Sequence, residues 1–257
     1  MKFGISTSCL YPMNTEESLE ILCKGGVEQC EVFLNSDRET TPQFAKELKN
    51  IADAHSVKIV SAHPFSSFSE TFMLFSEYER RFYETLDFYK RFFETASVMG
   101  SDIAVIHGSL IPAKISKDEY FERFSKLIEA GKEFGIRVAP ENVRNHLNEN
   151  PDFLKEMKKA LGKDFKLVFD IKQSFIAGYD PIEFAKTFAQ DIIHIHISDH
   201  NPESPCLPPS KGCFDFGKLF SVMNNADYNG SYIIELYRHN FGKPEELFEA
   251  LSFVQNL

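Results

Sequence analysis

The chain lacks the long apolar segments that characterise membrane proteins and secreted precursors. No window approaches the roughly 20 apolar residues that a membrane-spanning helix requires. Residues 1–6 lead directly into a strand-like pattern instead of an apolar signal sequence. Tryptophan is absent, and the 26 phenylalanines are expected mainly to fill the core. We therefore expect a soluble protein with no membrane anchor.

Paired cysteines are also missing. The five cysteines are an odd number and form no C-x-x-C pair, which argues against a disulfide framework and against a structural zinc site. Reduced thiols are typical of the cytosol. A cytoplasmic location is therefore expected.

Positive charge is scarce, and no glycine-rich phosphate loop is present. The chain has 28 Lys and Arg against 38 Asp and Glu, a net charge of −10, which repels the phosphate backbone of nucleic acids unless a local basic patch overrides it. No G-x-G-x-x-G or P-loop motif occurs, which weakens a nucleotide-binding fold. These absences favour a small-molecule substrate and disfavour nucleic acid as a partner.

What the chain does have is a regular alternation of strand and helix patterns. Eight β-branched runs are each followed by a segment of helical periodicity, which is typical of repeated βα units and a parallel sheet. The expected strands are 2–7, 27–34, 58–62, 103–107, 137–141, 166–170, 192–197 and 232–236. The expected helices are 15–24, 41–55, 77–99, 117–134, 151–161, 181–188, 215–224 and 244–255.

The number of units decides between two folds. Alternating strands and helices also suit an open doubly wound sheet, but eight units favour a closed barrel. The length of 257 residues is close to the typical size of such a barrel. We therefore predict the α/β class, with residues 1–257 forming a single (β/α)8 TIM barrel domain.

Polar residues end almost every expected strand. In a barrel of this type the active site lies at the carboxyl ends of the strands, so these side chains should meet at one level. They are His63, His107, Glu141, Asp170, His196 and Glu235. Buried carboxylates repel one another, and a divalent cation removes that conflict. Glu141, Asp170, His196 and Glu235 therefore form a predicted site for one divalent ion, and this ligand set suits Mn²⁺, Mg²⁺, Zn²⁺ or Co²⁺ about equally.

The remaining polar side chains are assigned more varied roles. His63 and His107 are expected to hydrogen-bond substrate or backbone more readily than to bind metal. His194 points to the same face as His196 but one layer deeper, so a core role is expected. For Lys172, we favour a solvated loop position over a cation at the mouth of the barrel.

At these residues the sequence resembles the xylose isomerase-like TIM-barrel superfamily over nearly its whole length. The superfamily holds sugar and sugar-phosphate isomerases and epimerases, inosose and 3-dehydroshikimate dehydratases, and endonuclease IV. The motifs that carry the resemblance are residues 1–6, Gly26-Val27-Glu28-Gln29-Cys30-Glu31, Pro140-Glu141-Asn142, Phe169-Asp170-Ile171-Lys172-Gln173, His194-Ile195-His196-Ile197-Ser198-Asp199 and Ile234-Glu235.

The resemblance implies that the four predicted ligands bind one catalytic ion, with Glu141 and Glu235 flanking the substrate. In the ketose epimerases of the superfamily, such a glutamate pair moves a proton next to a carbonyl while the metal stabilises the enediolate. Glu141 and Glu235 are thus the candidate catalytic pair. The candidate substrate-binding residues are His63, His107, Asn142, Lys172, Gln173 and Asp199.

Two positions depart from the superfamily pattern. Many members carry Asp-x-x-His after the sixth strand, where this chain has Gln173 in place of the histidine. An amide can bind a hydroxyl but cannot carry a proton near neutral pH. Several epimerases carry an arginine six residues past the seventh-strand histidine, where this chain has Pro202.

Three functional classes therefore remain open. The leading hypothesis is a metal-dependent isomerase or epimerase acting on a small sugar or sugar-phosphate, and a dehydratase with the same metal site follows closely. The second is an AP endonuclease of the endonuclease IV type, which the histidines at 63 and 107 favour and the missing histidine at 173 disfavours. The third is a barrel that binds sugar or metal without catalysis. A homo-oligomer is compatible with the aromatic residues of segment 77–99, although packing against the barrel explains them equally well.

Overall fold

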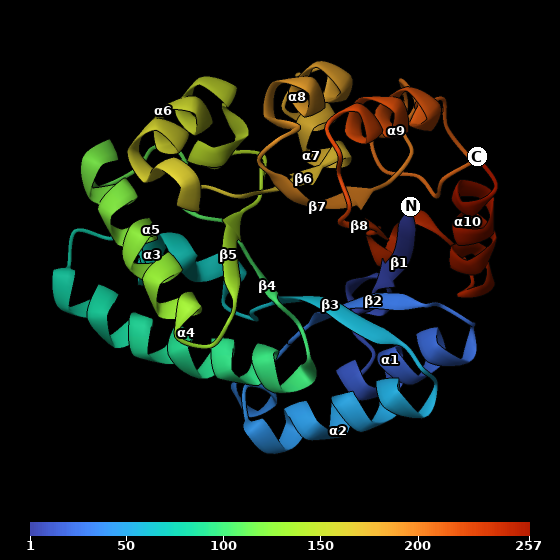
Figure 1. Cartoon of the computed structure of the whole chain (residues 1–257), viewed down its shortest axis with the longest axis horizontal. Helices are drawn as coiled ribbons and strands as arrows, with labels where there is room; N and C mark the ends of the chain where they lie inside the picture. Colours follow the sequence, from blue (N-terminus) through green and yellow to red (C-terminus); the bar gives the residue numbers. More distant parts are fainter.

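The computed structural model describes residues 1–257, and its eight parallel strands form a nearly closed barrel (Figure 1). The sheet order is β5-β4-β3-β2-β1-β8-β7-β6, and a single bridge between Glu141 and Val168 joins the two outer strands. The strands are β1 Lys2–Ser6, β2 Gln29–Phe33, β3 Lys58–His63, β4 Ile103–Ile106, β5 Arg137–Pro140, β6 Leu167–Asp170, β7 Ile192–Ile197 and β8 Ser231–Ile234.

Helices surround the barrel, as the alternation in the sequence predicts (Figure 1). They are α1 Thr15–Lys24, α2 Pro42–Ala54, α3 Glu70–Met73, α4 Glu79–Met99, α5 Lys117–Lys132, α6 Pro151–Leu161, α7 Ile171–Ile176, α8 Pro181–Phe188, α9 Phe216–Asn225 and α10 Glu245–Gln255. The (β/α)8 barrel and all eight predicted strands are confirmed, and no strand end is shifted by more than two residues. The short helices α3 and α7 were not predicted.

The aromatic residues of α4 serve the barrel of their own chain. Five of the six aromatic side chains considered for an oligomer surface are buried, namely Phe82, Phe88, Tyr89, Phe92 and Phe93, and Tyr83 alone is exposed. Their burial removes apolar area from water and fastens the longest helix to the sheet. The helix ends at Gly100, whose φ of 91° lies in the left-handed region that glycine adopts without strain. Intramolecular packing therefore explains the aromatic pattern.

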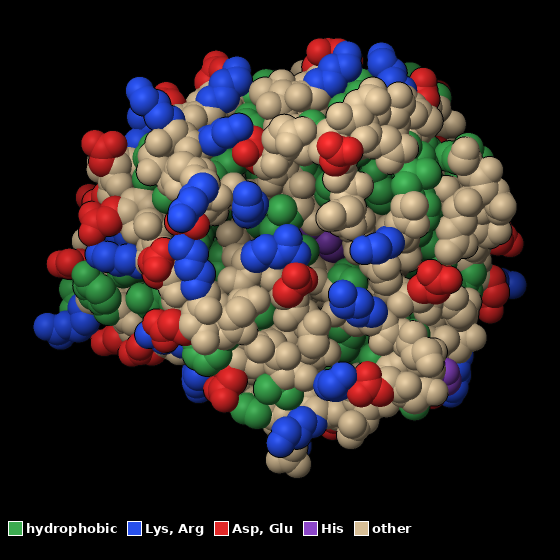
Figure 2. Space-filling model, viewed as in Figure 1, with side chains coloured by type: hydrophobic (Ala, Val, Ile, Leu, Met, Phe, Trp, Pro, Cys, Tyr) green, Lys and Arg blue, Asp and Glu red, His purple; other side chains and the backbone are tan.

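Charged side chains are unevenly spread over the side shown in Figure 2. Basic and acidic side chains are interspersed toward the rim, and Lys and Arg side chains predominate around the centre. No helix is both long enough and apolar enough to cross a lipid bilayer.

The two unpredicted helices both lie in loops at the carboxyl ends of strands. The α3 helix lies in the connection between β3 and α4, and α7 starts directly after β6. Asp170 caps α7 by accepting a hydrogen bond from the Gln173 backbone N–H at 2.9 Å. This cap places Lys172 on the first turn of a helix at the end of the barrel where the predicted metal ligands lie.

Candidate metal centre at the carboxyl ends of the strands

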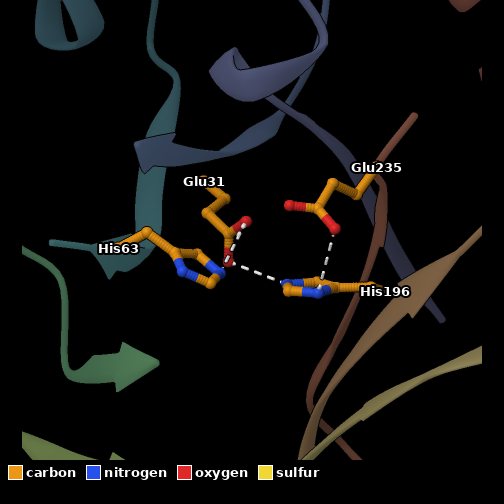
Figure 3. Close-up of side chains that lie close together, drawn as sticks. All are labelled: Glu31, His63, His196 and Glu235. Atoms are coloured by element: carbon orange, nitrogen blue, oxygen red, sulfur yellow. Dashed lines mark hydrogen bonds and ion pairs between the residues drawn. The ribbon is translucent and has the colours of Figure 1, made fainter. Parts of the chain in front are cut away.

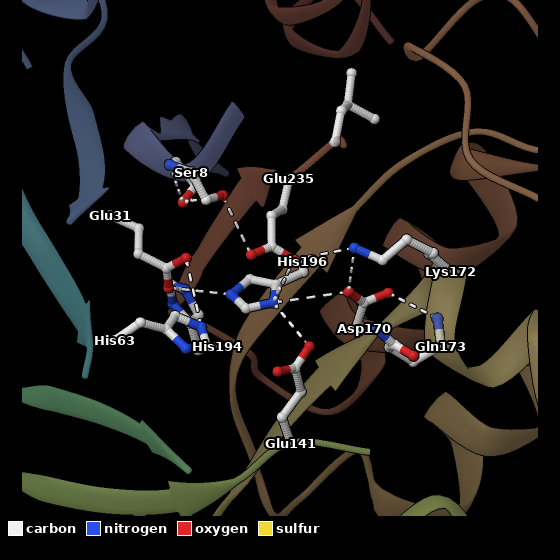
Figure 4. Close-up of polar contacts among 12 residues, drawn as sticks. Ser8, Glu31, His63, Glu141, Asp170, Lys172, Gln173, His194, His196 and Glu235 are labelled. Atoms are coloured by element: carbon white, nitrogen blue, oxygen red, sulfur yellow. Dashed lines mark hydrogen bonds and ion pairs between the residues drawn. The ribbon is translucent and has the colours of Figure 1, made fainter. Parts of the chain in front are cut away.

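The structure brings the four predicted metal ligands together. The Nδ1 atom of His196 lies 3.2 Å from Glu141 Oε1, 3.5 Å from Glu235 Oε2 and 3.8 Å from Asp170 Oδ2 (Figure 4). Ligand atoms that surround one ion at about 2.1 Å stand roughly 3 to 4 Å apart. Asp170 Oδ2 is buried and accepts no hydrogen bond, although it forms an ion pair with the Lys172 ammonium at 3.1 Å. The donor set and its spacing therefore fit a divalent cation.

His196 is held from its other side by Glu31, a residue that the strand-end search missed. Its Nε2 lies 3.0 Å from Glu31 Oε2 (Figure 3), while its Nδ1 faces the three carboxylates (Figure 4). A metal-binding histidine characteristically donates its second ring N–H to a carboxylate, which fixes the ring orientation and tautomer. Glu31 is completely buried in β2 and is placed to give His196 that support.

Glu31 also forms hydrogen bonds with residues deeper in the barrel interior. It accepts a hydrogen bond from Ser61 at 2.7 Å, and its Oε2 lies 3.1 Å from His194 Nε2. His194 is fully buried and also contacts Ser61 at 3.1 Å, which matches the expected core role. His63 stacks on the ring of Phe33, and its Nε2 lies 3.7 Å from Glu31 Oε1. Glu31, Ser61, His63 and His194 thus form a buried polar layer next to the candidate metal ligands, which we call the polar floor.

The electrostatics of the cluster depend on its mixture of charges. Burial alone would raise the pKa of Glu31, but His196 and His63 outweigh that effect and hold it well below its usual range. Burial alone would lower the pKa of His196, but Glu31, Glu235 and Glu141 raise it well above its usual range. Burial raises the pKa of Asp170 to about 7 despite the neighbouring Lys172. Asp170 is thus the carboxyl of this cluster that a further positive partner would help to ionise at neutral pH.

A cavity of about 670 Å³ opens directly above the cluster. Its volume lies within the range of roughly 300–1,000 Å³ typical of sites for small organic ligands. Both polar side chains and aromatic rings line it. The lining includes Ser8, Tyr11, Phe33, Phe65, Phe68, His107, Glu141, Lys172, Gln173, Glu235 and Tyr237. Both candidate catalytic glutamates therefore face space that a substrate can occupy.

Three of the predicted substrate-binding residues line this cavity. His107 is 21% exposed, and its Nε2 lies 3.2 Å from Glu141 Oε2. Gln173 also lines the cavity, although its Oε1 accepts a hydrogen bond from the Arg144 backbone N–H at 3.1 Å. Lys172 is the third, and its position corrects the expected solvated one. It is only 2% exposed, because its ammonium is paired with Asp170 and Glu235.

The other three do not line the cavity. His63 is buried in the polar floor. Asn142 clamps the end of β5 to β6 by donating to the Asp170 carbonyl and accepting from the Asp170 N–H. Asp199 accepts backbone hydrogen bonds from residues of the loop after β7, including Gly212 and Phe214. These contacts position the neighbouring backbone, and the substrate-binding role of Asn142 and Asp199 stays a prediction.

A second group of metal-type side chains, His63, His107 and Glu141, shares Glu141 with the first, and a third, Glu31, His63, His196 and Glu235, shares His196 and Glu235 with it. Within each group, the ligand atoms lie within 4.8 Å of one another. Glu70, the first residue of α3, is fully buried nearby and accepts hydrogen bonds from Tyr89 at 2.9 Å and from the Gly108 N–H at 2.6 Å. No strand-end pattern identifies Glu70, because it lies in the β3–α4 connection. Burial raises the pKa of Glu70 to about 7.

Fold and site together define an α/β barrel with a carboxylate and imidazole cluster at the carboxyl ends of its strands. The sequence model of the xylose isomerase-like TIM barrel family matches residues 20–257, so the chain belongs to that family.

Relatives with known sequences include one of unassigned activity and one dehydratase. An uncharacterized protein of Methanocaldococcus jannaschii is 27% identical over 249 residues, covering 91% of this chain and 83% of its own length. An inosose dehydratase of Clostridium botulinum is 23% identical over 222 residues, covering 76% of this chain and 74% of its own.

Solved structures share the fold over the entire chain. A D-tagatose 3-epimerase-like protein has a TM-score of 0.83 at 24% identity, covering 100% of this chain and 96% of its own. The IOLI protein, solved with a bound zinc atom, has a TM-score of 0.76 at 18% identity, covering 100% of this chain and 96% of its own. At these identities, the structural likeness shows the fold alone.

Proposed function

We propose that the protein is a divalent-metal-dependent isomerase or epimerase that moves a proton next to the carbonyl of a small sugar or sugar-phosphate. The observation that carries this proposal is the placement of Glu141 and Glu235. Both line the cavity, and their ligand-type oxygens lie within 4.8 Å of each other beside His196. An epimerase needs one group to remove the proton and another to return it, and two carboxylates that line the same cavity can do both.

Glu141, Asp170, His196 and Glu235 would hold the ion. When bound, it supplies Lewis-acid stabilisation of the oxyanion that develops on the substrate carbonyl. A zinc atom in a related structure supports a metal, and the ligand set leaves Mn²⁺, Mg²⁺, Zn²⁺ and Co²⁺ as candidates.

Each glutamate has a second partner that orients its carboxylate. The Oε2 atom of Glu141 lies 3.2 Å from His107 Nε2, and Ser8 donates to Glu235 Oε1 at 3.3 Å. Burial alone would raise the pKa of Glu235, but Lys172 and His196 lower it. For Glu141, burial is likewise outweighed, here by His107 and His196, and its pKa lies well below the usual range. Both side chains are therefore carboxylates able to accept a proton from carbon.

The test is exchange of a carbon-bound proton with D₂O, followed by NMR, over a panel of free and phosphorylated ketoses with each of the four metals. Exchange by the wild type should fall roughly 10²- to 10⁴-fold in Glu141→Gln and in Glu235→Gln, which keep the size of the side chain. Glu122→Gln is the matched control, because Glu122 is an exposed residue of α5 paired with Lys126. Absence of exchange in the metal-loaded wild type on every ketose would contradict the proposal.

A dehydratase is the second candidate. It begins with the same proton abstraction and then requires protonation of a leaving hydroxyl. His107 lines the cavity beside Glu141 and would make that second transfer, and inosose dehydratases are among the relatives. Analysis of the products by mass spectrometry separates the two, because dehydration removes one water from the substrate and epimerisation leaves the mass unchanged.

An AP endonuclease is the third candidate, and it rests on the second metal-type group. His63, His107 and Glu141 could hold a further ion. Metal content distinguishes it: we expect about one ion per chain, lost in Glu235→Ala, whereas about three per chain would favour the nuclease.

A further inference from the structure

Lys172 occupies an unusual position for an ammonium group. Its Nζ lies 3.0 Å from Glu235 Oε2 and 3.1 Å from Asp170 Oδ2, and the side chain is 2% exposed (Figure 4). The ring of Tyr237 stands 4.7 Å away on the cavity side. Taking a charge out of water is costly unless opposite charges compensate for it. The two carboxylates supply that compensation, so they hold the lysine in the cluster.

The oxygens that bind the lysine are also oxygens of the candidate metal centre. Glu235 Oε2 and Asp170 Oδ2 are the atoms that face His196 Nδ1, at 3.5 and 3.8 Å. An ion ligated by these oxygens would stand close to an ammonium that is already in contact with both. Two cations at such a separation repel each other, and the repulsion is stronger away from bulk water.

We propose that Lys172 is an internal counter-ion that competes with the divalent ion for Asp170 and Glu235 and thereby lowers the metal affinity of the site. This inference rests on the metal centre of the proposed function. The ammonium stabilises the carboxylates before the ion binds and must move away from at least one of them when it does. The cavity beside Tyr237 provides space for that movement, since both residues line it.

The test is titration of the metal-free protein with Mn²⁺, with free Mn²⁺ followed by electron paramagnetic resonance. Lys172→Met keeps a long side chain and removes the charge, and Lys172→Arg keeps the charge. We expect Lys172→Met to bind Mn²⁺ at least about tenfold more tightly than the wild type. Lys172→Arg should not bind more tightly than the wild type. Lys218→Met is the matched control on the exposed face of α9 and should leave the affinity unchanged.

The outcomes separate this inference from the proposed function. Equal or weaker affinity in Lys172→Met, with a wild type that binds Mn²⁺, overturns the competition and leaves the metal centre intact. Binding by Lys172→Met alone supports the competition and contradicts a metal-dependent wild-type enzyme. Binding by neither overturns both.

A second measurement uses the wild type alone and therefore does not depend on whether the variants fold. In a crystal structure of the Mn²⁺-saturated wild type, the Lys172 ammonium should have left Asp170, Glu235 or both. Retention of both contacts beside a bound ion would overturn the inference.

Discussion

The two halves of the barrel use their acidic residues in opposite ways. On the side of β5 to β8, Glu141 and Glu235 line the cavity, and Asp170 Oδ2 has no hydrogen bond, although the Lys172 ammonium lies 3.1 Å away. On the side of β2 to β4, Glu31 and Glu70 are fully buried and do not line the cavity, and serine, tyrosine, histidine and backbone groups surround them. The first group faces space that a substrate can occupy, and the second holds the surrounding structure through hydrogen bonds, although Glu31 Oε1 accepts none.

The contrast suggests a division between ligands and their supports. Glu31 holds the ring of His196, the one histidine among the proposed ligands, and Glu70 ties the β3–α4 connection to the loop after β4 through Gly108. Gly108 has a φ of +86°, and a Cβ there would lie 2.4 Å from the Tyr120 hydroxyl, so only glycine fits. Substitutions on the two sides should therefore differ in what they change, and the following experiments test that difference.

The largest effect is expected for His196, which connects the two sides. His196→Ala removes a ligand and leaves Glu31 buried without its closest imidazole partner. We expect loss of bound metal and a decrease in the free energy of unfolding on the order of 3–5 kcal/mol, because breaking one half of a buried charge pair is costly. Metal analysis and urea unfolding measure the two effects. Retention of metal by this variant would contradict the assignment of His196 as a ligand.

Glu70 should control a pH-dependent part of stability. Burial raises its pKa from 4.5 to about 7, so the folded state favours the protonated form. The contribution of the protonated Glu70 to the free energy of unfolding is fully present below about pH 4.5. It is lost as the pH rises through 7, where the buried carboxyl ionises. Between these values the wild type should lose on the order of 3 kcal/mol relative to Glu70→Gln. Urea unfolding of both proteins across this range measures the difference, and parallel curves would contradict it.

Glu31→Gln should weaken metal binding without abolishing it. Loss of a carboxylate behind a metal-binding histidine typically lowers the affinity 10- to 100-fold. Calorimetric titration compares this variant with Glu235→Gln, which removes a ligand carboxylate and should lose more. If the two variants are affected equally, the division between ligands and supports does not hold.

Gln173 is expected to give the smallest effect. Its amide oxygen accepts a hydrogen bond from the Arg144 N–H rather than facing the ligand cluster. Gln173→Ala should lower the free energy of unfolding by about 0.5–1.5 kcal/mol and leave metal affinity unchanged. Thermal unfolding and a metal titration check both expectations, and a large loss of metal affinity would make Gln173 part of the metal centre.

The sequence predicts the β5 to β8 side better than the β2 to β4 side for a physical reason. Glu141, Asp170, His196 and Glu235 each lie within one residue of the end of an apolar strand, and the carboxyl ends of barrel strands meet at one level. Glu31 lies within a strand between Cys30 and Val32, and only the register of the closed barrel places it beside His194 and His196. Local patterns do not contain that register.

Helix α7 shows a second limit of the sequence. It has six residues, too few for a clear helical period, and its start depends on the cap from Asp170. A loop was therefore expected there, and with it a solvated lysine. In the structure, the helix directs Lys172 into the cluster, so the local conformation and the charge of the site were missed together.

The most direct test of the account is the position of a bound ion. Crystals of the wild type grown with Zn²⁺ and measured at the zinc absorption edge give the metal position from anomalous scattering. We expect one site within about 2.0–2.2 Å of His196 Nδ1 and of oxygens from Glu141, Asp170 and Glu235. An ion held instead by His63, His107 and Glu141, or no ion in the barrel, would contradict the assignment of the metal centre.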